Sequence, residues 1–201
     1  MAKGHVWRTL PSEDATNSAL WNGAVARFES EDYSAAGAGF QALAEQGSVN
    51  ALVYLGYMYT EGLGVPADRD KAIHSYRRAA EQGSVHGQWA LAMLLHLRNE
   101  FPEALSWYVK AAEQSHPSAT YWVFSMYSRG EGTDRDAQKA QDYLIAALRL
   151  GHIGALRARA SQLLQGSEGL GGIARGLGML AKSVVSAAQI AYANPNSPYI
   201  R

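Results

Sequence analysis

A short segment that recurs along the chain constrains its fold more than any other feature. Residues 44–49 read Ala-Glu-Gln-Gly-Ser-Val, and residues 80–85 repeat them letter for letter. A third copy begins at residues 112–114 with Ser115 in the glycine position, and a weaker fourth ends at residues 150–152. The glycine positions are therefore spaced by 36, 32 and 36 residues. Self-similarity at such a period is typical of solenoids, in which each unit is one supersecondary element.

Other positions keep the same register, which makes a chance match untenable. Small residues recur at one position of the unit and large apolar residues four positions later. The small set is Ala36, Ala72, Ala104 and Ala140, and the large set is Phe40, Tyr76, Tyr108 and Leu144. One helix earlier, a second small set comprises Ala19, Ala51, Gly87, Ala119 and Ala155.

Each unit is predicted to contain two helices, as the second unit illustrates. Ala51, Leu55 and Met58 lie on one face of a first helix near residues 51–60. A glycine-containing loop follows, and Asp68 is suited to cap a second helix near residues 69–82. Gly83 then stands where a left-handed helix end is favoured.

The fourth unit repeats this pattern, whereas the first and third are four residues shorter. Gly130, Gly132 and Asp136 occupy the positions of Gly62, Gly64 and Asp68. The short units lack the glycine loop, and we expect Tyr33 and Phe101, which align, to fill the turn between their helices.

Composition and charge exclude several classes of protein. The 201 residues include 18 basic and 18 acidic side chains, and no run of Lys or Arg exceeds two residues. Nucleic-acid binding needs clustered cations, so we expect none. The chain has no cysteine, no secretory signal is evident, and no apolar run approaches the length that spans a bilayer. We therefore expect a cytoplasmic protein.

At residues 51–83 the chain resembles the Sel-one-like repeats, a subfamily of tetratricopeptide-like solenoids. The residues that carry the resemblance are Ala51, Leu55-Gly56, Tyr59, residues 62–65, Asp68, Lys71-Ala72, Tyr76, Ala79-Ala80 and Gly83. Residues 119–151 match less fully, and Phe124 stands where a small residue is expected, so we expect altered packing there. The short units are similar to ordinary tetratricopeptide repeats.

The resemblance implies an all-α fold: a right-handed α/α solenoid of antiparallel helix pairs with a C-terminal capping helix. We assign residues 1–18 to an N-terminal extension and residues 19–169 to four or five repeats. The repeat boundaries are 19–49, 50–85, 86–117, 118–153 and a partial 154–169. A capping helix at 170–193 and a tail at 194–201 follow.

The resemblance also implies a concave surface, lined by the first helices, that receives a protein partner. One column of those helices holds Trp21, Val53, Trp89, Tyr121 and Arg157, and the column four residues later holds Val25, Tyr57, Met93 and Ser125. Exposed aromatic residues there would anchor a partner. Alternatively, the rings pack between adjacent repeats. Asn50 and His86 share a column at the mouth of this groove, where they either bind a partner backbone or are simply solvated.

Catalytic, metal and cofactor sites have no support in the sequence. The six histidines are scattered, without the spacing that metal ligands show. No nucleophile elbow, P-loop or HExxH motif is present. We therefore predict that the chain is not an enzyme and takes no cofactor, metal or small-molecule substrate.

Residues 170–193 form an amphipathic helical pattern. The apolar stripe consists of Ile173, Leu177, Leu180, Val184, Ala188 and Ala191. The opposite face consists of Arg175, Lys182 and Gln189. A docked cap over the last repeat is the first interpretation. Gly172 and Gly176 would allow close packing on another helix, which leaves dimerisation through this helix as an alternative. With only two cations, the helix is not expected to bind membranes.

Two functions follow from this sequence. The first is an adaptor or scaffold that binds a protein segment on the concave face. The second is a dedicated neutralising partner, such as an immunity or chaperone protein for a bacterial toxin. The partner's identity is not encoded in any motif.

Overall fold

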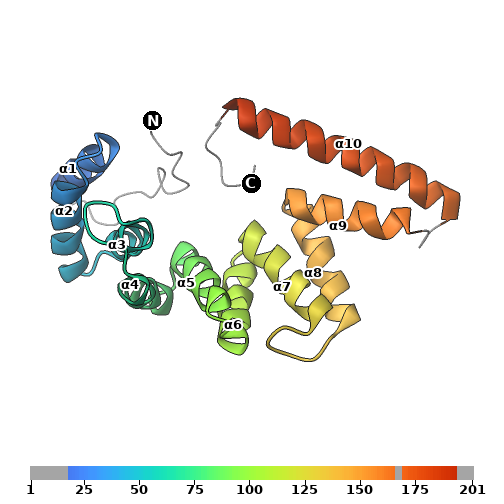
Figure 1. Cartoon of the computed structure of the whole chain (residues 1–201), viewed down its shortest axis with the longest axis horizontal. Helices are drawn as coiled ribbons and strands as arrows, with labels where there is room; N and C mark the ends of the chain where they lie inside the picture. The colour runs from blue at the N-terminus through green and yellow to red at the C-terminus, as the bar shows by residue number, and fades with distance from the viewer. Residues whose placement is uncertain (1–17, 166–168, 194–201) are drawn as a thin grey trace. The chain divides into compact units, whose positions relative to one another are not determined.

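The computed structural model describes residues 18–165 and 169–193, which are helical throughout apart from short turns (Figure 1). The expected N-terminal extension and tail lie outside these residues, apart from Ser18. The described part comprises ten helices: α1 (Ser18–Glu29), α2 (Tyr33–Glu45), α3 (Val49–Glu61), α4 (Arg69–Glu81), α5 (Val85–Leu97), α6 (Phe101–Glu113), α7 (Pro117–Arg129), α8 (Ala137–Arg149), α9 (Ile153–Leu164) and α10 (Gly169–Ala193). The predicted all-α class is confirmed.

The helices belong to two compact units, one containing residues 18–110 and the other residues 111–165 and 169–193. In the first unit, α1 packs on α2, α2 on α3, α3 on α4 and α4 on α5. In the second, α7 packs on α8, α8 on α9 and α9 on α10. Consecutive helix pairs thus cover one another, as a solenoid requires.

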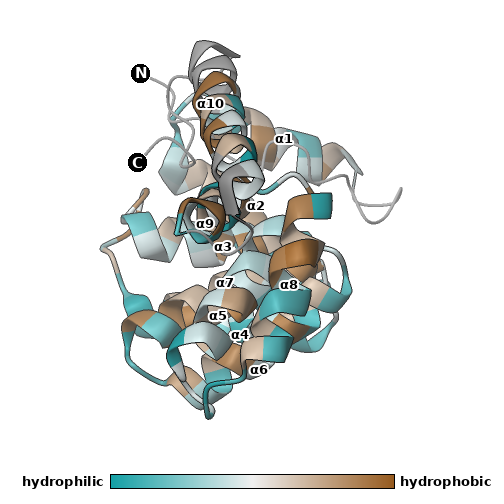
Figure 2. Ribbon diagram, turned by 90° about the vertical axis from the view of Figure 1, so that its right-hand side faces the viewer, coloured by the Kyte–Doolittle hydropathy of each residue, from teal (hydrophilic) through white to brown (hydrophobic). Residues whose placement is uncertain are grey.

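The repeated positions of the sequence form the core. Ala36, Ala72, Ala104 and Ala140 are buried, as are the large residues four positions later, Phe40, Tyr76, Tyr108 and Leu144. Because these residues recur once per repeat, each helix pair contributes similar small and large side chains to the interior of its own unit. Hydrophobic stretches are distributed over the helices, with a marked one in α8 (Figure 2).

The predicted helix caps are present. The backbone N–H of Lys71 donates to Asp68 at 3.0 Å, and that of Lys139 donates to Asp136 at 2.9 Å. These bonds satisfy donors that the first turn of a helix otherwise leaves unpaired. Gly83 has φ +87°, the left-handed conformation expected of a helix end.

The loop of the second repeat returns to the first repeat. Gly64 has φ +68°, and a Cβ placed on it would lie 2.6 Å from the carbonyl carbon of Tyr33. Only glycine allows this approach of the loop to the start of α2. In the short repeats, Tyr33 contacts Phe28 with ring centroids 5.3 Å apart, and Phe101 contacts His96 at 5.1 Å. Each ring thus contacts the helix that precedes its turn, and whether the two rings fill the turns stays a prediction.

Phe124, the departure from the repeat pattern, is matched by a change in its partner helix. In the second repeat Gly56 lies against the ring of Tyr76. The equivalent residues of the fourth repeat are Phe124 and Leu144, and Phe124 packs against the buried cluster that contains Leu144. The larger residue has moved from the second helix of the pair to the first, so the interface remains filled.

The last helix docks through a different face from the one predicted. Two residues of the expected apolar stripe do not face α9, because Leu177 is 58% exposed and Val184 is 63% exposed. Leu180 is half-buried, and the side chains of Ile173, Ala188 and Ala191 lie outside the described part. Gly172, Gly176 and Ser183 are buried instead. A Cβ on Gly176 would lie 3.0 Å from the carbonyl oxygen of Ala160 in α9, so small residues let the two backbones approach closely. The close packing predicted for the glycine pair is thus observed at Gly176, on α9 within the chain.

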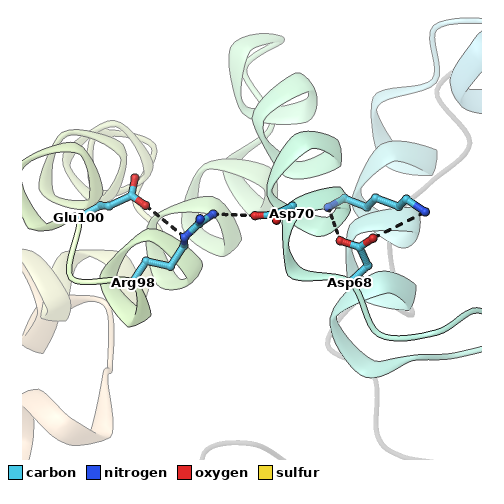
Figure 3. A network of polar contacts seen from close by, with 5 residues as sticks. Asp68, Asp70, Arg98 and Glu100 are labelled. Atoms are coloured by element: carbon cyan, nitrogen blue, oxygen red, sulfur yellow. Dashed lines mark hydrogen bonds and ion pairs between the residues drawn. The ribbon is translucent and has the colours of Figure 1, made fainter.

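Successive repeats of the first unit are also joined by charged groups (Figure 3). Arg98, just after α5, donates to Asp70 at the start of α4 at 2.9 Å, and its Nε lies 3.2 Å from Glu100. These side chains are largely exposed, so their interaction is weak and sensitive to salt.

Candidate protein-binding surface

The first helices of the repeats present the predicted binding residues at different depths. Trp21 of α1 is only 5% exposed, and Val53 of α3 is fully buried. The ring of Trp21 packs edge-on against Phe40 and Tyr54, at centroid distances of 5.8 and 5.7 Å. The expectation that this column is exposed is therefore wrong for these two residues. For Trp21 the alternative applies, because it fills the space between the first repeat and the second.

Trp89, the third member of this column, is half-buried on α5. Its equivalent in the preceding repeat, Val53, is fully buried, whereas the side chain of Trp89 remains partly exposed to solvent. A tryptophan that is partly exposed on a helical scaffold can provide a large contact area for a partner.

In the first unit, the column four residues later is more evenly exposed to solvent than the column that contains Trp21. Val25, Tyr57 and Met93 are all half-buried, on α1, α3 and α5. Tyr57 lies 6.3 Å from Phe28 between ring centroids. Burial raises the pKa of Tyr57 to about 12, with smaller effects from Glu61 and Tyr33. The phenol is thus neutral at physiological pH and can act as a hydrogen-bond donor.

The two polar candidates differ in exposure. Asn50 is 8% exposed and forms part of the interior, so it is less accessible than predicted. His86 at the start of α5 is half-buried, and burial lowers its pKa below the ordinary value for histidine. His86 is therefore predominantly uncharged at neutral pH, which lets it contact apolar as well as polar groups.

The candidates of the second unit do not form the same arrangement. Tyr121 of α7 stacks on His152 with ring centroids 4.6 Å apart and also contacts Phe124. Its ring thus packs against the start of α9, in the following repeat. Ser125 is buried, whereas Arg157 of α9 is exposed.

His152 has unusual surroundings for a residue at the start of a helix. Ser48, Ser84 and His116 hold the equivalent position, and each accepts a backbone N–H bond of 3.1–3.2 Å. His152 makes no such cap, and its Nδ1 is buried without a hydrogen-bond partner. Burial lowers its pKa to about 4.

We define the inner-helix patch as Tyr57, His86, Trp89 and Met93. All four lie in the first unit, on the first helices α3 and α5 of two successive repeats, and all are half-buried. The patch contains two aromatic side chains, one thioether and one imidazole, and none of them carries a full charge at neutral pH. Such a surface suits an apolar or extended peptide better than an ionic ligand.

Sequence reasoning missed a repeated interaction between lysine and tyrosine. Lys71 Nζ lies 5.6 Å from the ring centroid of Tyr59, and Lys139 Nζ lies 5.2 Å from that of Tyr127. The two lysines align with each other, as do the two tyrosines, so the aligned columns carried the signal. Each pair links the two helices of a long repeat through a cation–π contact.

Other chemistries find little support in the part of the chain that the structure describes. Within residues 18–165 and 169–193, no group of three or more His, Asp or Glu side chains could hold a metal ion. Within the same residues, no helix is long and apolar enough to cross a bilayer.

The geometry defines a helix-pair repeat protein of the solenoid class. Residues 49–84, 86–116 and 117–152 each match the model of the Sel1 repeat, and together they make up about half of the chain. The chain belongs to the Sel1 repeat family. This fold is generally a scaffold for interactions between proteins.

A curated relative also matches part of the chain. The chain is 30% identical over 116 residues to the uncharacterized protein NMB1327 of Neisseria meningitidis serogroup B, a match that covers 58% of this chain and 25% of that protein. It therefore spans about a quarter of that relative's length.

Two crystal structures share the fold. The structure of c5321, a protective antigen present in uropathogenic Escherichia coli strains, superposes with a TM-score of 0.74 at 25% identity, over 84% of this chain and 38% of that one. A Sel1 repeat protein from Oxalobacter formigenes gives a TM-score of 0.69 at 25% identity, over 83% of this chain and 70% of that one.

Proposed function

We propose that this chain is a non-catalytic interaction scaffold that binds a segment of a partner protein through the inner-helix patch. The observation that carries the proposal is the partial exposure of Tyr57, Trp89 and Met93 at equivalent faces of successive first helices. Large side chains that stay partly accessible on a rigid framework lose little conformational entropy on binding.

The ionisable groups with strongly raised pKa values support a structural role rather than catalysis. Burial raises the pKa of Tyr76 and of Tyr108 above the ordinary value. Both phenols belong to the repeated core column and lie in the interior. An acid–base catalyst would instead need its titrating atom within reach of a substrate.

The proposal is tested by affinity purification from the native host with the wild-type chain and two variants of the same helix. Met93→Glu places a charge within the patch, whereas Leu97→Glu changes an apolar side chain one turn further along α5 that is already 62% exposed. We expect Met93→Glu to weaken capture of the partner at least about tenfold, which corresponds to about 1.4 kcal/mol. Leu97→Glu should leave capture unchanged.

Trp89→Phe provides a second measurement that separates binding from folding. The substitution keeps an aromatic side chain and should preserve the helical circular-dichroism spectrum and the melting temperature. Reduced capture by a folded Trp89→Phe protein supports the proposal. Equal capture by the wild type, Met93→Glu and Trp89→Phe contradicts it.

The alternative role as a neutralising partner of a toxin is not favoured by any contact within the described residues. Identification of a toxin among the captured proteins, together with rescue of growth on co-expression, would establish that role.

A further inference from the structure

The outward face of α10 is apolar although α10 is already docked on α9. Leu177, Val184 and Val185 are 58, 63 and 56% exposed. These are among the most exposed large hydrophobic side chains in the described part of the chain, and they lie within nine residues of one helix. An exposed apolar cluster of this kind usually marks a contact with another molecule.

The spacing along this face is that of a two-stranded coiled coil. Ala174, Leu177, Ala181 and Val184 are all exposed and follow one another at intervals of three, four and three residues. Such alternation keeps one seam of a helix facing a partner helix. We call these four residues the outer seam. The buried residues Gly172, Gly176 and Ser183 lie on a separate side of α10, so the seam is free while α10 remains on α9.

From the outer seam we infer that the chain forms a homodimer in which the α10 helices of two copies pair antiparallel. The seam alternates small and large side chains. With a two-fold axis near Met179, Leu177 of each copy faces Ala181 of the other, and Val184 faces Ala174. Each large residue therefore meets a small one, which is how facing layers interdigitate without voids. A two-fold interface requires such self-complementarity.

The charges of α10 are compatible with pairing. Arg175 and Lys182 are both exposed, and the sequence of α10 contains no acidic residue. At about 100° per residue, the two cations lie on a third side of the helix, away from both the seam and α9. Pairing through the seam therefore brings no like charges together.

A lipid surface fits the seam less well than a second copy. Helices that lie on membranes carry many cations along the polar face and bulky apolar residues on the other. The described part of α10 has two cations, and half of its outer seam is alanine. Small residues weaken insertion into lipid but favour the close approach of a second helix.

Sedimentation velocity of the full chain tests the inference. We expect a reversible dimer that dissociates on dilution. The double variant Leu177→Glu/Val184→Glu should be monomeric and keep the helical circular-dichroism spectrum, because both side chains are more than half exposed. Its melting temperature, unlike that of the wild type, should not rise with protein concentration. The matched control Arg175→Glu/Lys182→Glu should remain dimeric. A monomeric wild-type chain overturns the inference, as does a double seam variant that still forms dimers.

The absence of cysteine from the chain permits a test of the geometry. Protein carrying Leu177→Cys is mixed with protein carrying Ala181→Cys and oxidised. We expect the mixed disulfide to form faster than the Leu177→Cys homodimer. Faster formation of the homodimer indicates a parallel pair and contradicts the proposed arrangement. A wild-type chain that is monomeric but binds anionic phosphatidylserine vesicles through the seam overturns the dimer and assigns the face to lipid.

Discussion

The ring of Tyr76 lies directly on the backbone of Gly56. A Cβ added to Gly56 would be 2.7 Å from two ring carbons of Tyr76, closer than packed atoms approach. Tyr76 is itself 2% exposed and lies among the buried side chains of α4, so the ring has little freedom to move aside. The contact fixes how closely α3 and α4 pack.

We predict that Gly56→Ala lowers the free energy of unfolding by about 1–3 kcal/mol, because it overpacks this contact. The gain of about 1 kcal/mol in helix propensity offsets only part of the loss. Tyr76→Leu introduces the residue found at Leu144 and should make Gly56→Ala much less damaging. A urea-denaturation cycle of the two single variants and the double variant measures the coupling. Additive effects would contradict direct contact as the cause.

Two glycines should respond oppositely to the same substitution. Gly23 lies in α1, and no atom lies within 4 Å of an added Cβ, so Gly23→Ala should stabilise the protein by roughly 0.5–1 kcal/mol. At Gly87 of α5 the added Cβ would be 2.8 Å from the Cβ of Ala79 and 2.9 Å from the backbone nitrogen of Ala80. We expect Gly87→Ala to cost about 1–3 kcal/mol by forcing α4 and α5 apart. Thermal unfolding of both variants checks the signs.

Stability should fall on mild acidification because of His152. Its pKa in the folded chain is about 4, below the ordinary value of 6.5, so the unfolded chain takes up the proton first. Stability is therefore complete above about pH 6.5 and decreases as the pH falls towards 4. Since the ring is partly solvated, we expect a loss on the order of 1–2 kcal/mol.

His152→Ser is the matched control for this pH dependence. It removes the titrating ring and installs the residue that caps the equivalent helices at Ser48 and Ser84. Urea denaturation at pH 7 and pH 5 should show a smaller difference for His152→Ser than for the wild type. An identical difference would assign the effect to other groups, such as His86.

The Arg98 network is predicted to contribute little and to depend on salt. Asp70 is 83% exposed at its side chain and Arg98 45%, so water screens the pair. Arg98→Ala should lower the free energy of unfolding by at most about 1 kcal/mol at low ionic strength. The difference from the wild type should disappear in high salt, as measured by urea denaturation at two salt concentrations. A large effect that is independent of salt would point to lost packing of the Arg98 stem.

Features that depend on the local chain were predictable from the sequence. Asp68, Asp136 and Gly83 cap helices because residue type and spacing suffice to define a cap. The repeated core positions were equally predictable, since the same residue types recur at equivalent positions of four repeats.

Depth of burial and choice of docking face were not predictable in the same way. Trp21 and Trp89 share a column, yet Trp21 is enclosed by Phe40 and Tyr54 whereas Trp89 is half-buried. Helical spacing identifies the direction of a side chain but not the size of its neighbours. In α10 the apolar stripe suggested the docked face, but Gly176 allows a closer approach to α9 than Leu177 would. Whether the inner-helix patch binds a partner stays a prediction.

The return of the Gly64 loop to Tyr33 has a consequence for biosynthesis. On the ribosome, α1 and α2 emerge before the segment that rests on the start of α2 has been made. The start of α2 therefore cannot be covered by this loop until the chain has been translated beyond residue 64. Nascent chains arrested shortly before and shortly after this point should differ in how readily a protease cleaves near Tyr33.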